Sequence, residues 1–185
     1  MQERAILMPV ESSRPFLQIG PPTGACSPRT SGFSIRFTHP MHIEERIRIA
    51  VPPAAIELIW SEVDRWHLWD PDTKQAFLNG PFAVGTKGRI TPRKGMGVPM
   101  AVTERTEGRS FTVEGYIPLF RMHFEHTVTP LAEGSEVTHR VWFTGPLAFL
   151  FGPSVAKQVR AGLPRTMQSL KEYAEQRPKP ELAAA

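Results

Sequence analysis

Between residues 43 and 144, hydrophobic and polar positions alternate with the two-residue period of β-strands. The first alternating segment runs from Ile43 to Val51 and ends at the pair Pro52-Pro53. Six further segments follow at 75–78, 87–92, 98–106, 110–117, 120–129 and 137–143. Strands that succeed one another at such short spacing favour an antiparallel meander with one solvent-facing side.

Helical spacing replaces this alternation in two parts of the chain. Residues 54–60 and 64–69 predict two short helices just after the first strand, and Pro53 suits a first helical turn. Near the end of the chain, apolar residues recur every three or four positions at Val155, Val159, Leu163, Met167, Leu170 and Ala174. We expect one long helix over roughly 154–175, kinked at Pro164. Residues 149–153 should interrupt the helix-compatible run that Gly145-Pro146 opens.

Three of the four tryptophans fall within residues 60–71. A tryptophan buries a large apolar area, but its indole N–H needs a partner. We interpret the cluster as a helical lid over an apolar chamber, with Trp66 and Trp69 at its mouth. The alternative is that the rings are ordinary core, since pockets share their apolar lining with the core.

The length of 185 residues suits one domain with a tail. Proline recurs among Ser, Thr and Gly before residue 42, which favours a disordered extension over 1–41 with Phe33–Phe37 as a candidate strand. We expect a folded domain over 42–176 and a disordered tail over 177–185. The net charge of +4 comes from scattered Lys and Arg, which indicates a solvated surface and no nucleic-acid partner.

The single cysteine, Cys26, excludes an intrachain disulfide and a cysteine-based zinc cluster. No apolar run has membrane-spanning length, and the apolar stretch near the amino terminus is too short for a signal peptide. We therefore expect a cytoplasmic protein with no membrane span and no cofactor.

Several short motifs occur in the order found in a known family. They are Val51-Pro-Pro53, Ile59-Trp60, Asp64-Arg-Trp66, Trp69-Asp-Pro71, Leu78-Asn-Gly80, Gly85-Thr86, Gly134 to His139, Gly145-Pro-Leu147, Leu163-Pro164 and Leu170. Each motif is weak alone, but together over residues 43–176 they resemble START-like proteins of the SRPBCC superfamily. Within it, the chain is most similar to the bacterial polyketide cyclase/dehydrase-like group.

This resemblance implies the α+β helix-grip fold, in which a curved antiparallel sheet wraps around a long C-terminal helix and two short helices follow the first strand. It also implies a deep cavity between sheet and helix that binds lipids or apolar or aromatic small molecules. Some members of the family cyclise or dehydrate polyketides. The family has no universal catalytic motif, so the resemblance assigns no catalytic residue here.

His126 and His139 fall on the apolar faces of their strands, and we expect them near-diagonal to each other on adjacent strands. A histidine in an apolar chamber can polarise a carbonyl or move a proton near neutral pH. The alternative is a pair of buried neutral histidines that are bonded to backbone carbonyls or water.

His123 and Glu125 point away from His126 on the same strand, so the three cannot converge on one ion, and we expect no metal site. They should be exposed, with Arg140 nearby. Asp64 and Asp70 flank the tryptophans as a candidate acid–base pair, although capping and turn formation are the more ordinary roles for such residues.

The leading hypothesis is a binding protein for a hydrophobic small molecule, lipid or polyketide-like. Its cavity lining would be Trp66, Trp69, Phe111, Val113, Met122, Phe124, His126, His139, Val141, Phe143, Val155, Val159, Leu163 and Met167. The second is a polyketide cyclase/dehydratase-type enzyme with His126 or His139 as general acid/base, and the third is a partner-binding module. An inward-facing polar pair with no backbone hydrogen-bond partner would favour the enzyme, and a fully satisfied pair would favour a carrier, that is, the binding protein.

Overall fold

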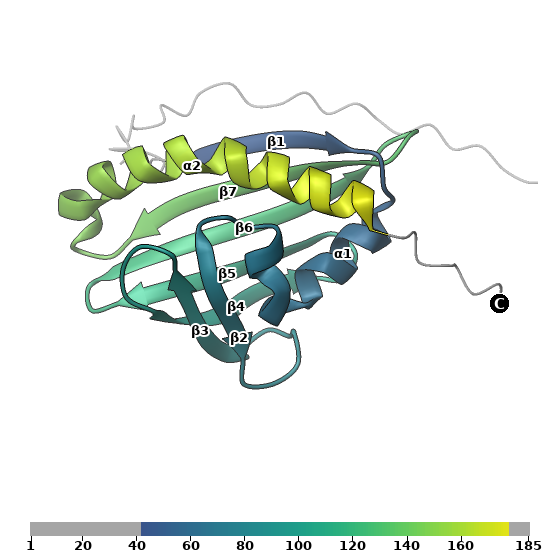
Figure 1. The fold of residues 1–185 in the computed structure, drawn as a ribbon. Helices are drawn as coiled ribbons and strands as arrows, with labels where there is room; N and C mark the ends of the chain where they lie inside the picture. Colours follow the sequence, from purple (N-terminus) through teal and green to yellow (C-terminus); the bar gives the residue numbers. More distant parts are fainter. Residues whose placement is uncertain (1–41, 178–185) are drawn as a thin grey trace, which may run out of the picture. The chain divides into compact units, whose positions relative to one another are not determined.

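The computed structural model describes residues 42–177. Its elements are β1 (Ile43–Ile49), α1 (Pro53–Ser61), the 3₁₀ helix η1 (Val63–Leu68), β2 (Thr73–Leu78), β3 (Lys87–Pro92), β4 (Val98–Thr106), β5 (Ser110–Ile117), β6 (Phe120–Pro130), β7 (Ser135–Thr144) and α2 (Ala148–Gln176) (Figure 1). The strands and short helices match the predicted segments closely. The expected extension over 1–41, with its candidate strand, and all but the first residue of the expected tail lie outside the described residues.

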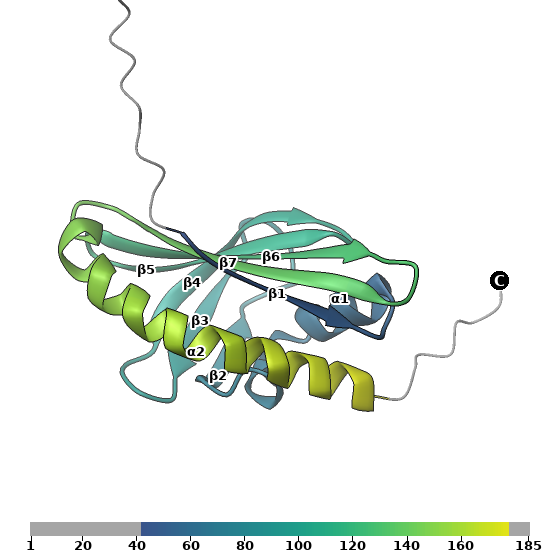
Figure 2. The ribbon, with the colours of Figure 1, turned by 90° about the horizontal axis from the view of Figure 1, so that it is seen from above.

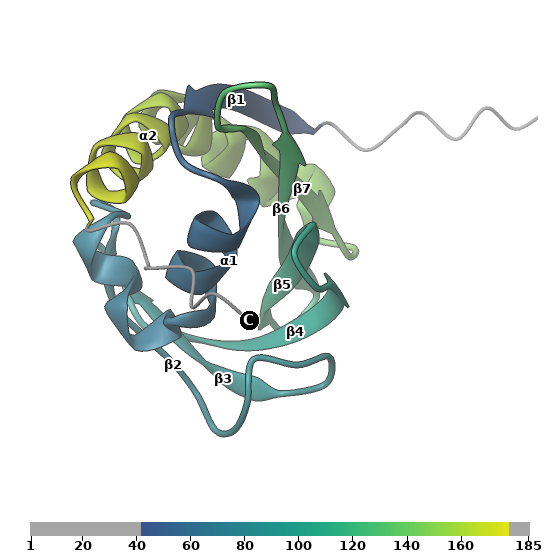
Figure 3. The same cartoon turned by 90° about the vertical axis from the view of Figure 1, so that its right-hand side faces the viewer.

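The seven strands form one antiparallel sheet in the order β1-β7-β6-β5-β4-β3-β2. The sheet curls, and α2 crosses its concave side close to β1 and β7 (Figures 1 and 2). Viewed along the curl, α1 lies inside it, while α2 and η1 occupy the gap between the edge strands β1 and β2 (Figure 3). This arrangement confirms the predicted α+β helix-grip fold.

The hairpin between β6 and β7 determines which inward-facing residues meet. Pro130 pairs with Ser135, so the intervening loop has four residues. Gly134 in that loop has a φ of +83°, and a Cβ there would lie 2.1 Å from the carbonyl oxygen of Ile49. Only glycine combines this left-handed backbone with so close an approach, which holds the loop against the end of β1.

Buried side chains form two clusters along the interior. The first surrounds α1 and η1 and includes Trp60, Trp66, Phe111 and Leu170. The second lies under the first half of α2 and contains Ile43, Phe120, Val141, Phe143, Ala156 and Leu163. Phe124 packs against both clusters and therefore marks the boundary between them.

The long helix begins earlier than its sequence pattern predicts. α2 is continuous from Ala148 and includes Pro153, so the expected interruption at 149–153 is wrong. Pro153 lies in the second turn and removes a single donor, and the buried Gly152 and Ala156 beside it keep this part of the helix packed on the sheet. The helix bends as it crosses the sheet and carries Pro164 within it, as expected (Figure 2). Among the described residues, no helix is both long and apolar enough to cross a membrane.

Candidate functional site

His126 and His139 lie side by side on the concave face of the sheet. They are paired directly across β6 and β7, and their ring centroids are 3.9 Å apart. The expectation of a near-diagonal pair is therefore wrong, because the two residues are directly opposite each other. The four-residue loop between the strands sets this register, because it pairs Pro130 with Ser135 and thus His126 with His139.

Aromatic rings enclose the pair. His126 stacks on Phe111 at 4.3 Å with the planes 3° apart, and the ring of Trp60 lies 5.8 Å from His126. On the other side, Phe124 lies 6.2 Å from His139. Both histidines are buried, so their ring nitrogens have little access to solvent.

Burial also determines their charge. It lowers the pKa of His139 to about 3. Burial and the neighbouring His139 hold the pKa of His126 well below its usual value, although the nearby Phe124 carbonyl offsets part of that shift. At neutral pH both rings are therefore uncharged, and each offers one N–H donor and one nitrogen acceptor.

Several of these donors and acceptors are unpaired. Among residues 42–177, no hydrogen-bond partner is present for Nδ1 of His126, for either ring nitrogen of His139 or for the indole N–H of Trp60. Each buried polar atom left in this way costs about 1–3 kcal/mol. Native interiors hold few such atoms, so four of them on three adjacent rings are unusual.

Sequence reasoning missed two charged residues, Glu45 and Arg105. Both lie in the row of paired residues that crosses the sheet through His126 and His139. Glu45 pairs with His139 across β1 and β7, and Arg105 pairs with Phe111 across β4 and β5, so both side chains start from the concave face. An irregularity in β4 between Val102 and Glu104 turns Arg105 inward, where its guanidinium contacts Glu57 of α1 at 2.6 Å. The sequence pattern could have revealed Glu45, because it is a charged residue between Ile43 and Ile47 at a position where the alternation calls for an apolar one.

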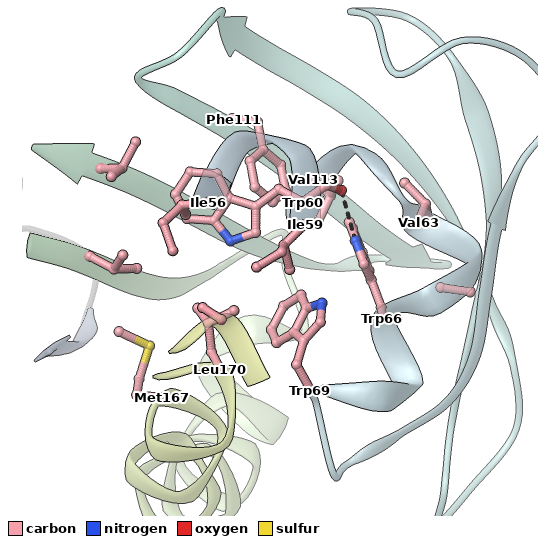
Figure 4. Close-up of a cluster of buried hydrophobic side chains, with 14 of the residues drawn as sticks. Ile56, Ile59, Trp60, Val63, Trp66, Trp69, Phe111, Val113, Met167 and Leu170 are labelled. Atoms are coloured by element: carbon pink, nitrogen blue, oxygen red, sulfur yellow. Dashed lines mark hydrogen bonds between the residues drawn. The ribbon is translucent and has the colours of Figure 1, made fainter. Parts of the chain in front are cut away.

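The tryptophans fill one end of the interior. The indole N–H of Trp66 donates to the Trp60 carbonyl at 2.9 Å, and Trp69 packs near Leu170 of α2 (Figure 4). Only 4% of Trp66 and 3% of Trp69 is exposed. They are core residues, and their expected place at a solvent-facing mouth is wrong, because η1 folds them inward against Phe111 and α2.

The other predicted lining residues divide into two groups. Phe111, Val113, Val141, Phe143, Leu163 and Met167 are buried. Met122, Phe124, Val155 and Val159 remain half-buried although they pack on the inner clusters. The partly exposed members of the predicted lining therefore gather around the first half of α2.

Two surface hollows lie away from the histidine pair. One of about 380 Å³ is lined by Tyr116, Ile117, Leu119 and Arg121 at the β5–β6 turn. The other, of about 220 Å³, is lined by Ser61, Asp64, Phe77 and Phe82 beside α1 and η1. Neither includes any of the predicted lining residues, so sequence reasoning did not anticipate them.

The outer face of the sheet differs from its prediction. His123 is half-buried, because its ring stacks on Trp142 at 4.9 Å and bonds to the Thr144 hydroxyl at 2.8 Å. The expectation that it is exposed is therefore wrong. Glu125, also half-buried, forms an ion pair with Arg140, the neighbour that was expected. No group of three or more His, Cys, Asp or Glu in the described part of the chain is placed to hold a metal ion.

The two aspartates have different roles. Asp70 forms the expected turn, accepting from the backbone N–H of Asp72 at 3.0 Å and from the Thr73 hydroxyl at 2.6 Å. Asp64 is exposed in the first turn of η1, whose N-terminus has no side-chain cap, so the capping role is wrong for this residue. The candidate acid–base role of the two aspartates beside the tryptophans stays a prediction.

Known proteins of similar fold were found among solved structures. A START superfamily protein from Mycobacterium smegmatis aligns with a TM-score of 0.60 at 17% identity, covering 73% of this chain and 97% of that one. A protein from Mesorhizobium loti aligns with a TM-score of 0.59 at 14% identity, covering 75% and 99%. The di-domain ARO/CYC StfQ of the steffimycin biosynthetic pathway aligns with a TM-score of 0.60 at 13% identity, covering 73% of this chain and 50% of StfQ. At these identities the likeness shows the fold alone.

The sequence itself matches a family model. No curated protein matches it, but the model for polyketide cyclase / dehydrase and lipid transport proteins matches residues 40–175. This match spans the whole described domain except its last two residues. The chain therefore belongs to the polyketide cyclase / dehydrase and lipid transport family.

Proposed function

We propose that the domain binds a largely apolar small molecule, lipid or polyketide-like, between the sheet and the first half of α2. The molecule would carry a carbonyl or hydroxyl group that bonds to the histidine pair. The observation that carries this proposal is the set of unpaired ring nitrogens on Trp60, His126 and His139. The half-buried apolar residues around the first half of α2, of which Phe124 lies near His139, would form the entrance and the apolar walls.

A neutral imidazole suits this role. Uncharged histidines beside a bound ketone donate N–H bonds to its oxygen, and beside a hydroxyl they also accept. Such bonds replace unmet hydrogen-bonding capacity, so they favour a polar ligand over a hydrocarbon of the same shape. The walls contribute about 25 cal/mol per Å² of apolar ligand surface removed from water, before the costs of association.

A cyclase or dehydratase reaction is the second candidate, and the unpaired ring nitrogens are the outcome that was expected to favour it. The low pKa of His139, about 3, argues against it as a general base at neutral pH, because efficient bases have a pKa near the working pH. The same ring can still donate a hydrogen bond to a carbonyl that gains negative charge in an aldol-type cyclisation. In that case replacing the ring would lower product formation by roughly 10²–10³-fold.

The test compares two probes of similar shape, 2-acetylnaphthalene and 2-ethylnaphthalene, by equilibrium dialysis against the full chain. We expect the ketone to bind more tightly by about 1–2 kcal/mol, or roughly five- to thirtyfold, because only its oxygen accepts bonds from the histidines. His139→Phe keeps a ring at this position but removes two of the four unpaired nitrogens, and it should reduce the preference while the hydrocarbon still binds.

The matched control is His123→Phe, which makes the same change on the outer face of the sheet and should leave the preference intact. Equal binding of the two probes by the wild type, or an unchanged preference in His139→Phe, would contradict the proposal. Binding of neither probe, together with no copurifying molecule by native mass spectrometry, would favour the partner-binding alternative instead.

A further inference from the structure

Exposed apolar side chains gather where α2 begins. Phe149 is 88% exposed and Leu150 61%, and Phe151 follows them in the same turn. Ile117 and Leu119 at the β5–β6 turn are also exposed. The start of α2 and this turn lie at the same end of the domain, opposite the end that α1 closes (Figure 1). We call these five residues, Ile117, Leu119, Phe149, Leu150 and Phe151, the apolar tip.

Two contacts hold the two halves of the apolar tip close together. The backbone N–H of Leu147 donates to the Leu119 carbonyl at 2.9 Å, which ties the start of α2 to the turn. The rings of Phe151 and Phe120 lie 6.5 Å apart, edge to face. A contiguous exposed patch of this kind marks an interaction surface, whereas single exposed apolar residues are common.

The backbone at Leu119 supports a role for this side chain. Its φ is +65°, the left-handed conformation that glycine and asparagine adopt at less cost. Leu119 is 61% exposed, so core packing does not account for a leucine at this strained position. A strained position held by an exposed apolar residue is typical of a functional surface.

The charged residues along most of α2 are all cationic. From Ala148 to Lys171, α2 contains Lys157, Arg160, Arg165 and Lys171 and no acidic residue. Lys157 and Arg160 are exposed, about 12–17 Å along the helix from Phe149 at 1.5 Å per residue. An exposed aromatic and aliphatic tip followed by cationic side chains is complementary to an anionic lipid surface, which accepts apolar side chains and attracts Lys and Arg.

We propose that the apolar tip inserts into the surface of an anionic lipid bilayer, with Lys157 and Arg160 against the headgroups. Val155 and Val159, the half-buried residues beside the interior, follow one to three turns further along the same helix. If the proposed ligand site is correct, docking in this way brings its entrance next to the bilayer. The docking itself does not depend on the ligand.

The test is co-sedimentation of the full chain with vesicles of phosphatidylcholine and phosphatidylglycerol, with pure phosphatidylcholine vesicles alongside. We expect binding to the anionic vesicles that weakens with added salt. The double variant Phe149→Ser/Leu150→Ser should bind at least about tenfold more weakly, since it loses two inserting side chains. Lys157→Glu/Arg160→Glu should lose the preference for anionic lipid, whereas Lys74→Glu/Lys87→Glu, the matched charge change at exposed positions of β2 and β3, should keep it.

Leu119→Gly separates binding from folding. It relieves the left-handed backbone, so the thermal midpoint should stay or rise while vesicle binding falls. Met96→Ser/Val84→Ser, two exposed apolar residues elsewhere, should not change binding. The proposal is overturned if the wild type does not sediment with anionic vesicles, or if the tip variants bind as well as the wild type. It is also overturned if the tip variants only convert a dimer to a monomer in size-exclusion chromatography while vesicle binding is absent.

Discussion

The neutral state of His126 and His139 links the interior of the domain to pH. An unfolded histidine binds a proton near pH 6.5, whereas the folded protein resists protonation of His139 down to about pH 3. Between these values the unfolded state binds more protons, so the free energy of unfolding rises with pH and falls on acidification. The stabilising difference is fully present above about pH 6.5 and is lost as the pH drops towards the folded value.

We therefore predict that His139→Phe flattens the dependence of stability on pH. Urea unfolding between pH 7 and pH 4.5 should show the wild type losing about 2.5 kcal/mol more than the variant, from about 1.4 kcal/mol per pH unit below the unfolded pKa. His67→Gln changes an exposed histidine of η1 and is the control, with a wild-type slope. If the stability of the wild type and of His139→Phe depended on pH in the same way, the folded His139 ring would be shown to take up its proton at the same pH as an unfolded histidine.

At the scale of elements, α2 is held to the rest of the domain by contacts at its middle as well as by its apolar stripe. Asp70 accepts a hydrogen bond from the Thr166 hydroxyl at 3.2 Å, and Arg165 forms an ion pair with Asp72. Asp70 is mostly enclosed, and burial raises the pKa of its carboxyl while the hydroxyls of Thr73 and Thr166 and the Asp72 N–H act in the opposite direction. The loop after η1 thus connects the tryptophan end of the interior to the helix that covers it.

Replacement of Asp70 should weaken this connection. Asp70→Ala leaves the buried Thr166 hydroxyl and the Asp72 N–H without their acceptor, so we expect a loss of about 1–3 kcal/mol in the free energy of unfolding. Asp70→Asn retains one acceptor oxygen and should cost less. Asp64→Ala, at the exposed aspartate of η1, should change stability by less than about 0.5 kcal/mol. A similar small effect for Asp70→Ala would mean that α2 is held by its apolar stripe alone.

Across the whole molecule, the two ends of the domain differ in how completely they are filled. Rings from α1, η1 and β5 occupy one end, where Trp66 and Trp69 are almost wholly buried. Under the first half of α2, the inner residues Met122, Phe124, Val155 and Val159 stay half-buried. The histidine pair lies near the boundary between these regions, since Phe124 contacts both clusters. A ligand that entered under α2, as proposed, would therefore meet its polar partners, the two histidines, at this boundary.

The proline-rich segment before the domain leads to a prediction about the full chain. Residues 1–41 have little apolar periodicity, and the family match begins only at residue 40. A chain that starts at His42 should keep the thermal midpoint of the full chain within a few degrees, because a segment without an apolar pattern adds little to a core. Differential scanning calorimetry of both chains gives the comparison. A large drop for the shorter chain would show that residues such as Phe33 and Phe37 pack on the domain.

The strand and helix segments, and the inward direction of His126 and His139, could be predicted from the sequence. Alternation and helical spacing are local consequences of backbone geometry, so they can be recognised without knowledge of any tertiary contact. The sequence also indicated the family, and with it the helix-grip fold. Its one error of this kind was at Pro153, where packing of Gly152 and Ala156 on the sheet overrides the local preference to interrupt the helix.

The composition of the candidate site was decided by contacts between residues far apart in the chain. Glu45 lies beside His139 because β1 pairs with β7, and the histidines oppose each other because of the loop between their strands. Trp66 and Trp69 are core because η1 turns them towards α2, and His123 is covered because Trp142 stacks on it. Burial, register and the pairing of polar atoms depend on which segments meet, and periodicity along one segment carries no information about its partners.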